Sequence, residues 1–145
     1  MKRDEKKLIQ GLSSGNRVSL SRLISIIESD PSAILRIFQS IKKVPNNVYT
    51  IGITGPPGAG KSTLTSQIIK KFREDGLTIG VIAVDPSSPF TGGAVLGDRI
   101  RMQEHTLDNS VFIRSLGSRG DFGGMSNSAS GIVKLFDVFG MDIVI

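Results

Sequence analysis

The sequence contains no cysteine, which excludes disulfide bonds and metal sites built on thiolates. Aromatic residues make up only 6% of the chain, and the lysines and arginines are scattered despite a net charge of +5. That pattern lacks the basic stripe with stacking rings that is typical of nucleic-acid binding. A membrane-spanning helix needs about 18 consecutive apolar residues, and no apolar run in the sequence approaches that length. The opening residues MKRDEKKLIQ are not followed by the apolar segment of a signal peptide. We therefore expect a cytoplasmic protein that binds neither nucleic acid nor a membrane.

The chain has 145 residues, 39% of them hydrophobic and 21% charged, which is typical of a globular domain with a real core. Apolar residues recur at helical spacing from Lys6 to about Lys43, and the segment VPNN (44–47) then breaks the pattern. We predict an N-terminal helical segment over residues 1–46, followed by a second domain over 47–145.

From residue 48 onward, short β-branched runs alternate with helical patterns. The runs are VYTIGIT (48–54), LTIGVIAVD (77–85), VFIRS (from 111) and MDIVI (141–145). Helices are expected over 62–74, roughly 97–107 and roughly 126–139. Nearly continuous apolar strands alternating with helices predict an α/β fold with a mostly parallel sheet. The chain stops inside a core-like strand, so we expect it to be the N-terminal part of a longer protein whose second domain is incomplete.

The stretch GPPGAGKST fits the phosphate-loop pattern G-x-x-x-x-G-K-[ST], with a strand before it and a helix after it. Glycines let backbone N–H groups approach phosphates, and the amino end of the helix adds positive potential. The alternative is a chance glycine-rich turn. The residues predicted to bind the nucleotide are Gly55, Pro56, Pro57, Gly58, Ala59, Gly60, Lys61, Ser62 and Thr63.

Four side chains are candidates for the chemistry of this site. We expect Lys61 to reach the β- and γ-phosphates and the Ser62 hydroxyl to bind Mg²⁺. Asp85 ends the second strand, at the sheet edge where ligands of open α/β sheets bind, and Asp98 follows in a loop rich in hydroxyls. Lys61 and Asp85 are thus the candidate catalytic residues, and Ser62, Asp85 and Asp98 the candidate metal ligands. Asp98 has an alternative role, as an acid at a helix amino end.

Other polar residues have simpler interpretations. Arg114 and Arg119 indicate either a mobile loop near the phosphates or solvated arginines. Asp142 precedes the last strand and is predicted to hold the turn that enters it. His105 is predicted to be a surface or helix-end histidine rather than a catalytic one.

Four segments resemble the MeaB/ArgK family of phosphate-loop GTPases, the chaperones associated with methylmalonyl-CoA mutase. They are GITGPPGAGKSTL, VDPSSPFTGGAVLGDRIRM, FIRSLGSRGDFGG and LFDVFGMDIVI. The resemblance implies a P-loop NTPase fold and a Mg²⁺-dependent GTPase that binds GTP and GDP and assists a cobalamin-dependent mutase. It also implies that the loop 86–97 responds to the γ-phosphate, that residues 114–124 communicate with the mutase, and that the full-length protein is a homodimer.

Two other functions remain open at the level of sequence. One is a phosphate-loop kinase that transfers the γ-phosphoryl group to a small acceptor, with DPSSPFTGG as the acceptor loop. The other is a nucleotide-binding module without turnover. The choice of GTP over ATP follows only from the resemblance, because no base-reading segment lies within these residues.

Overall fold

The computed structural model describes residues 3–42, 46–85, 103–117 and 127–145. These residues form two compact units. The helical unit comprises Met1–Val48 and Met125–Met141, and the sheet unit comprises Tyr49–Gly124 and Asp142–Ile145. Among the described helices, none has both the length and the apolar character needed to cross a membrane.

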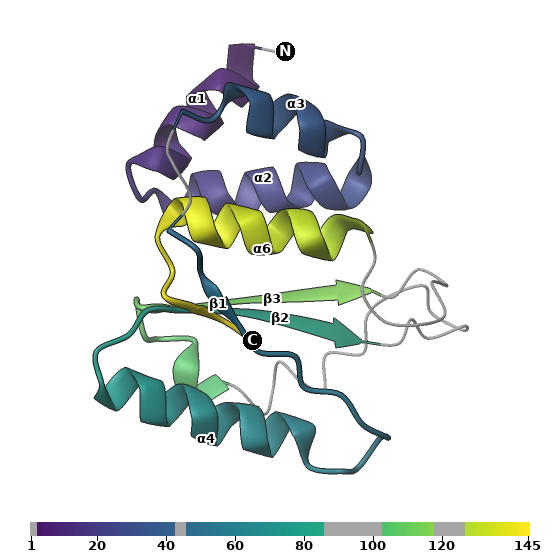
Figure 1. The fold of residues 1–145 in the computed structure, drawn as a ribbon, viewed down its shortest axis with the longest axis vertical. Coiled ribbons are helices and arrows are strands. Elements are labelled where there is room, and N and C mark those ends of the chain that lie inside the picture. The colour runs from purple at the N-terminus through teal and green to yellow at the C-terminus, as the bar shows by residue number, and fades with distance from the viewer. Residues whose placement is uncertain (1–2, 43–45, 86–102, 118–126) are drawn as a thin grey trace. The chain divides into compact units, whose positions relative to one another are not determined.

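Four helices build the helical unit: α1 (Arg3–Ser13), α2 (Arg17–Ser29), α3 (Ala33–Ser40) and α6 (Asn127–Phe139). Figure 1 shows α2 and α6 running side by side, with α1 and α3 beyond α2. Apolar residues spaced along these helices form the interior of this unit. The fully buried ones include Leu12, Leu20, Leu23, Ile24, Ile27, Ile37, Leu135 and Phe136.

The helical pattern expected between residues 6 and 43 is divided into three helices. Gly15 has a φ of 78°, which ends α1, and Asn16 then caps α2 by accepting a hydrogen bond of 2.9 Å from the Ser19 amide. The Arg36 guanidinium on α3 binds both carboxylate oxygens of Glu5 on α1, at 3.0 and 3.3 Å. A bidentate pair of this kind fixes the relative orientation of the two helices.

Two N–H groups of the segment that follows α3 bind one buried carboxylate. Asp137 on α6 accepts hydrogen bonds from the amides of Asn46 and Val48, at 2.8 and 3.2 Å. Asn47 between them has a φ of 61°, a left-handed conformation that asparagine tolerates better than most residues. This conformation lets both flanking amides reach the same oxygen.

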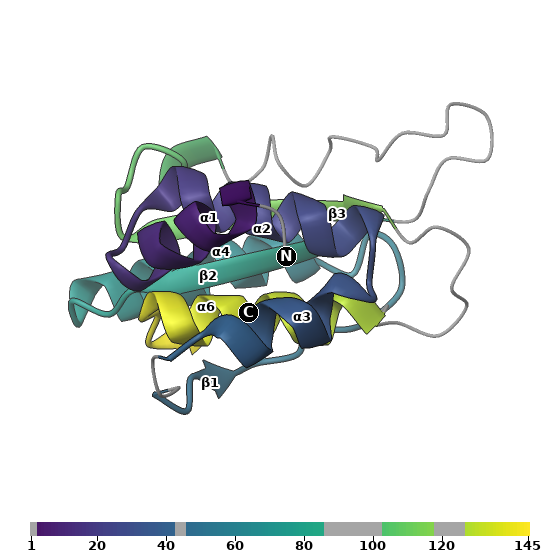
Figure 2. The same cartoon turned by 90° about the horizontal axis from the view of Figure 1, so that it is seen from above.

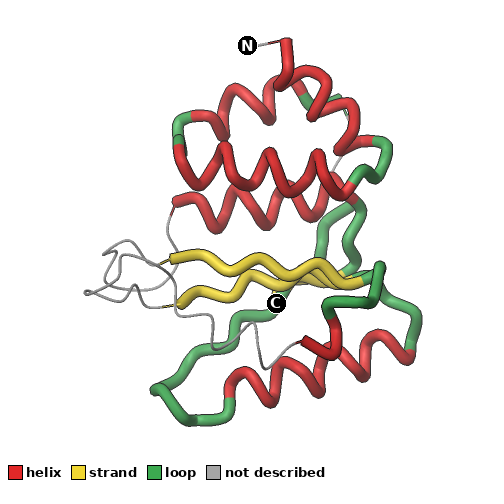
Figure 3. The backbone as a smooth tube through the Cα atoms, turned by 180° about the vertical axis from the view of Figure 1, so that it is seen from behind, coloured by secondary structure: helices red, strands yellow, loops and turns green. Residues whose placement is uncertain are grey.

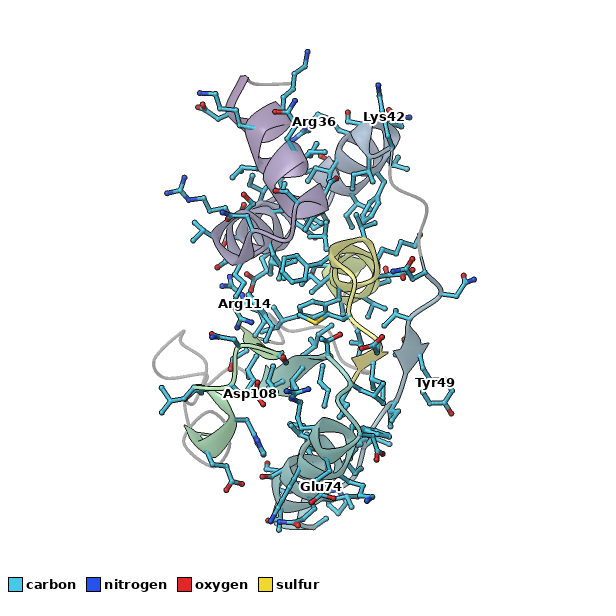
Figure 4. The ribbon with its side chains drawn as sticks, turned by 90° about the vertical axis from the view of Figure 1, so that its left-hand side faces the viewer. Arg36, Lys42, Tyr49, Glu74, Asp108 and Arg114 are labelled. Carbon is cyan, nitrogen blue, oxygen red and sulfur yellow. The ribbon has the colours of Figure 1, made fainter. Side chains whose placement is uncertain are left out.

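The sheet unit contains four parallel strands in the order β1-β4-β2-β3. Their bounds are β1 Tyr49–Thr50, β2 Ile79–Asp85, β3 Val111–Gly117 and β4 Ile143–Val144. Figure 2 shows β1 and β3 on opposite sides of β2, and Figure 4 shows the ring of Tyr49 pointing away from the edge strand β1. The α/β fold with a parallel sheet is therefore confirmed, as part of a domain.

Helix α4 (Lys61–Glu74) lies along one face of this sheet. Ile69 of α4 packs on Ile79 and Val81 of β2 and on Val111 of β3. The alternation of Ile79 and Val81 places both on the α4 side of the sheet. This apolar contact fixes the helix that follows the phosphate-loop motif.

The helix expected over residues 97–107 is not observed in its described part. Residues 97–102 lie outside the described structure, and only Gln103–His105 form a short 3₁₀-helix, η1. The chain turns after His105 because the Asp108 amide donates to the His105 carbonyl, at 3.2 Å. Asp108 Oδ1 then accepts from the Ser110 amide at 2.8 Å and directs the chain into β3.

The interpretation of Asp142 as a turn residue is confirmed. Its carboxylate accepts hydrogen bonds from both the amide and the hydroxyl of Thr78, each at 2.7 Å. The pair thus joins the start of β2 to the start of β4. The domain boundaries 1–46 and 47–145 stay a prediction; α6 follows the strands in sequence, yet it packs in the helical unit.

Candidate functional site

The glycine-rich stretch forms an exposed loop between β1 and α4. Gly58 and Gly60 have φ values of 77° and 86°, in the left-handed region that disfavours residues with a Cβ. A Cβ built on either glycine would meet no atom within 4 Å. These glycines are therefore required by the direction of the backbone, and the space above them is open to a ligand.

The amino end of α4 has a glycine at its N-cap position. Gly60 is the N-cap, and no side chain bonds to the first amides of the helix from that position. The intrahelical ladder begins only with the Leu64 amide, which donates to the Gly60 carbonyl at 2.9 Å. Helix amino ends of this kind carry about half a positive charge, which favours phosphate groups.

Lys61 lies over the loop from the first position of α4. Its Nζ donates to the carbonyl oxygens of Gly55 at 2.8 Å and Pro56 at 2.9 Å. An ammonium group has three N–H donors. Two of them are used by the loop carbonyls, so the charge is held above the loop, and among the described residues no partner of the third donor is seen.

The structure brings together the loop residues and the first turn of α4, but it does not test every predicted residue. Asp85 is the last residue of β2 and lies opposite Gly117 of β3 in the sheet register; its side chain is outside what the structure describes. Asp98 also lies outside the described residues. The grouping of Ser62, Asp85 and Asp98 around a metal therefore stays a prediction.

The structure tests the prediction for only one of the two arginines, Arg114 and Arg119. Arg114, labelled in Figure 4, is paired with Ile82 inside β3, so the expectation that it belongs to a loop is wrong. Strand β3 continues past Arg114 and ends at Gly117. Arg119 lies outside the described residues.

One polar cluster beside the loop was not anticipated. Ser66 on α4 is 5% exposed and donates a hydrogen bond to the Glu104 carboxylate, and its Oγ lies 2.8 Å from Nε2 of His105. Of the two alternatives predicted for His105, the surface position is wrong, because the residue is only 9% exposed, whereas the helix-end position is confirmed, because His105 is the last residue of η1. The sequence did carry one signal of this cluster. Ser66 occupies a buried position of α4, where an aliphatic residue would pack better.

No group of three or more histidine, aspartate or glutamate side chains converges on a point within the described ranges. The predicted metal ligands, the Ser62 hydroxyl and the carboxylates of Asp85 and Asp98, are all oxygen donors. Hard oxygen donors of this type, completed by water, suit Mg²⁺.

A parallel sheet whose first strand leads through a glycine loop into a helix with Lys-Ser-Thr at its start defines the class of P-loop NTPases. Residues 20–145 match the family described as Methylmalonyl Co-A mutase-associated GTPase MeaB. The chain belongs to this family, as the resemblance of its motifs implied.

Similar proteins carry related names. The chain is 50% identical over 138 residues to a Pyrococcus horikoshii protein whose name includes the word GTPase, with 95% of this chain and 44% of that protein covered. It is 37% identical over 141 residues to the Escherichia coli GTPase ArgK, with 94% and 43% covered. It is also 38% identical over 138 residues to the fused isobutyryl-CoA mutase of Cupriavidus metallidurans, with 91% of this chain and 12% of that protein covered. The chain thus spans less than half the length of these relatives.

Proposed function

We propose that this chain is the nucleotide-binding part of a Mg²⁺-dependent GTPase that serves as chaperone of a cobalamin-dependent mutase. The observation that carries the proposal is the loop itself. Its glycines adopt left-handed conformations, its lysine holds a charge over the loop carbonyls, and the loop leads directly into the amino end of α4, where Gly60 is the N-cap. These are the groups that bind the triphosphate in P-loop NTPases.

The residues present fit both the nucleotide and the metal. Residues Gly55–Thr63 contact the phosphates, with Lys61 at the γ-phosphate. The hydroxyl of Ser62, one residue further along α4, has the chemistry of a Mg²⁺ ligand, and the carboxylates of Asp85 and Asp98 complete the proposed set. When bound, Mg²⁺ supplies positive charge that offsets the charge of the phosphoryl oxygens.

The reaction we propose is attack of water on the γ-phosphorus, with cleavage of the bond to the β-phosphate oxygen and release of GDP and phosphate. Lys61 and the loop amides stabilise negative charge on the phosphoryl oxygens as that bond breaks. Asp85, at the end of β2, is proposed to help hold Mg²⁺ in position. We expect slow turnover, because the proposal assigns neither a general base nor an arginine finger to this site.

The proposed partner is a mutase that uses cobalamin. This part of the proposal is based on the description of the family and the name of one related protein. The family is described as mutase-associated, and a related sequence is part of a fused isobutyryl-CoA mutase. We further propose that the full-length protein is a cytoplasmic homodimer that resets the mutase through a loop held by the γ-phosphate.

The test is calorimetry of the chain with GTP, GDP and ATP, each with and without Mg²⁺, together with a phosphate-release assay. Guanine-specific binding that strengthens with Mg²⁺, accompanied by slow release, supports the proposal. Guanine-specific binding without release supports a binding module that needs the rest of the protein for turnover. Equal affinity for ATP, with turnover stimulated by a small acceptor, would instead favour a kinase.

A further inference from the structure

Two buried side chains, Ser66 and His105, form a cluster with the exposed carboxylate of Glu104, and this cluster connects the phosphate-loop helix to η1. Ser66 follows Ser62 by four residues, so the two hydroxyls lie on the same side of α4, one turn apart. Figures 1 and 3 show η1 beside α4. The cluster therefore joins α4, one turn beyond the proposed metal ligand, to a segment almost 40 positions later in the sequence.

Proton counting fixes how the three groups interact. A serine hydroxyl has one proton to donate, and here the proton goes to the Glu104 carboxylate. Nε2 of His105, 2.8 Å from the same oxygen, must then carry a hydrogen and donate it to Ser66. The order of donation is thus His105 to Ser66 to Glu104, which assigns the ring a definite hydrogen position. The order also excludes a hydrolytic triad, because a nucleophilic serine would have to donate its proton to the histidine.

A second contact links α4 to the same segment of chain. Arg73 lies seven residues, about two turns, after Ser66 and donates through Nε to Asp108 at 2.8 Å. Figure 4 labels Asp108, which lies on the chain between η1 and β3. The ion pair already attaches this chain segment to the far end of α4. The Ser66 cluster adds a contact in the half of the helix that carries Lys61 and Ser62.

Helix propensity also points to a specific role for Ser66. Thr65 and Ser66 are poor helix formers, and both are buried in the second turn of α4. Thr65 bonds back to the Lys61 carbonyl at 2.9 Å, which reinforces the first turn from within. Within the described ranges the Ser66 hydroxyl instead contacts Glu104 and His105 of η1.

We propose that Ser66 and His105 are positioning residues that hold the loop end of α4, and with it Lys61 and Ser62, in the place required for Mg²⁺-dependent nucleotide binding. This inference rests on the proposed function. Because Ser62 is the proposed metal ligand, a small displacement of the helix affects the metal-dependent part of the affinity more than the part due to the loop amides.

The experiment compares the affinity of the chain for a non-hydrolysable GTP analogue with and without Mg²⁺, by calorimetry. For Ser66→Ala and His105→Leu we expect the gain in affinity on adding Mg²⁺ to fall on the order of tenfold, because displacements of about 1 Å have effects of this size or larger. Affinity without Mg²⁺ is expected to stay within about twofold. His105→Gln keeps an N–H donor near the position of Nε2 and is expected to restore the gain.

The matched control is Asp108→Asn, which weakens the other contact of α4 with the same segment. We expect it to lower the melting temperature while leaving the effect of Mg²⁺ on affinity unchanged. His105 is the single histidine of the chain, so its imidazole signal in NMR is unambiguous. We expect that signal to shift when Mg²⁺ and the analogue bind to the wild type.

The outcomes separate the two proposals. A wild-type chain that binds no GTP analogue overturns the proposed function, and this inference with it. If the wild type binds but Ser66→Ala and His105→Leu lose only stability and keep the full effect of Mg²⁺, the cluster is structural and the inference is overturned alone. An imidazole signal that does not move at saturation overturns it as well.

Discussion

Replacing Lys61 by alanine tests the role of the charge above the loop. Its Nζ is fixed by two carbonyls, Gly55 O at 2.8 Å and Pro56 O at 2.9 Å. The third N–H is then available to a phosphate oxygen without loss of the other two bonds. A hydrogen bond between charged groups contributes about 1.5–3 kcal/mol. We therefore expect Lys61→Ala to weaken binding of GTP by about 10- to 150-fold.

The assay is calorimetry at about 0.15 M salt, where the Debye length of about 8 Å screens distant charges. Lys70→Ala is the matched control, because Lys70 is an exposed lysine nine residues later on the same helix. It removes the same net charge and is expected to leave the affinity within about twofold. Equal losses in both variants would show a general charge effect, and an unchanged Lys61→Ala affinity would refute the reasoning.

Three further predictions concern the stability of the two units. Asp137→Ala leaves two backbone amides without their acceptor and is expected to lower the unfolding free energy by about 2–3 kcal/mol, measured by urea denaturation. Gly11→Ala places a Cβ 2.1 Å from Oγ of Ser19 on α2, and the resulting overpacking is expected to cost about 1–3 kcal/mol. The hydrogen bond from Arg73 lowers the pKa of Asp108, so the stability that this carboxylate contributes is present above about pH 4 and is lost as pH falls through its folded value. The stability difference between wild type and Asp108→Asn is therefore expected to narrow below about pH 4.

Each of these predictions has a matched comparison. Asp137→Asn keeps an oxygen acceptor, so a loss as large as that of Asp137→Ala would contradict the hydrogen-bond argument. Gly52 has no atom within 4 Å of an added Cβ, and Gly52→Ala is expected to be nearly neutral; an equal cost would mean that crowding at Gly11 is not the cause. A stability difference for Asp108→Asn that is the same at pH 7 and pH 3 would contradict its linkage to Arg73.

The elements predicted well are those whose sequence signal is local. The run ending in Asp85 was expected to form a strand from residue 77 and does so from Ile79. Helix α4 was expected from residue 62 and begins at Lys61, because glycine before it permits the turn and apolar residues recur toward the sheet. The loop was predictable because the phosphate-loop pattern requires particular residue types at fixed spacing.

The features that were missed depend on contacts between distant segments. Nothing near His105 in the sequence indicates that it packs on Ser66, 39 positions earlier. The contact of Asp137 with the Asn46 amide spans 91 positions. The break between α1 and α2 did carry a local signal, Gly15 followed by Asn16, but the apolar stripe continues across it and masks the boundary. Burial and pairing of polar groups therefore required the structure.

The central claim is that backbone amides of the loop and of the first turn of α4 hold phosphate. Its most direct test is an NMR titration of ¹⁵N-labelled chain that follows the amides of Gly58, Ala59, Gly60 and Lys61. We predict that these signals shift on addition of GTP with Mg²⁺ and do not shift with guanosine, which has no phosphate. Loop amides that stay unchanged while GTP binds elsewhere on the chain would contradict the account.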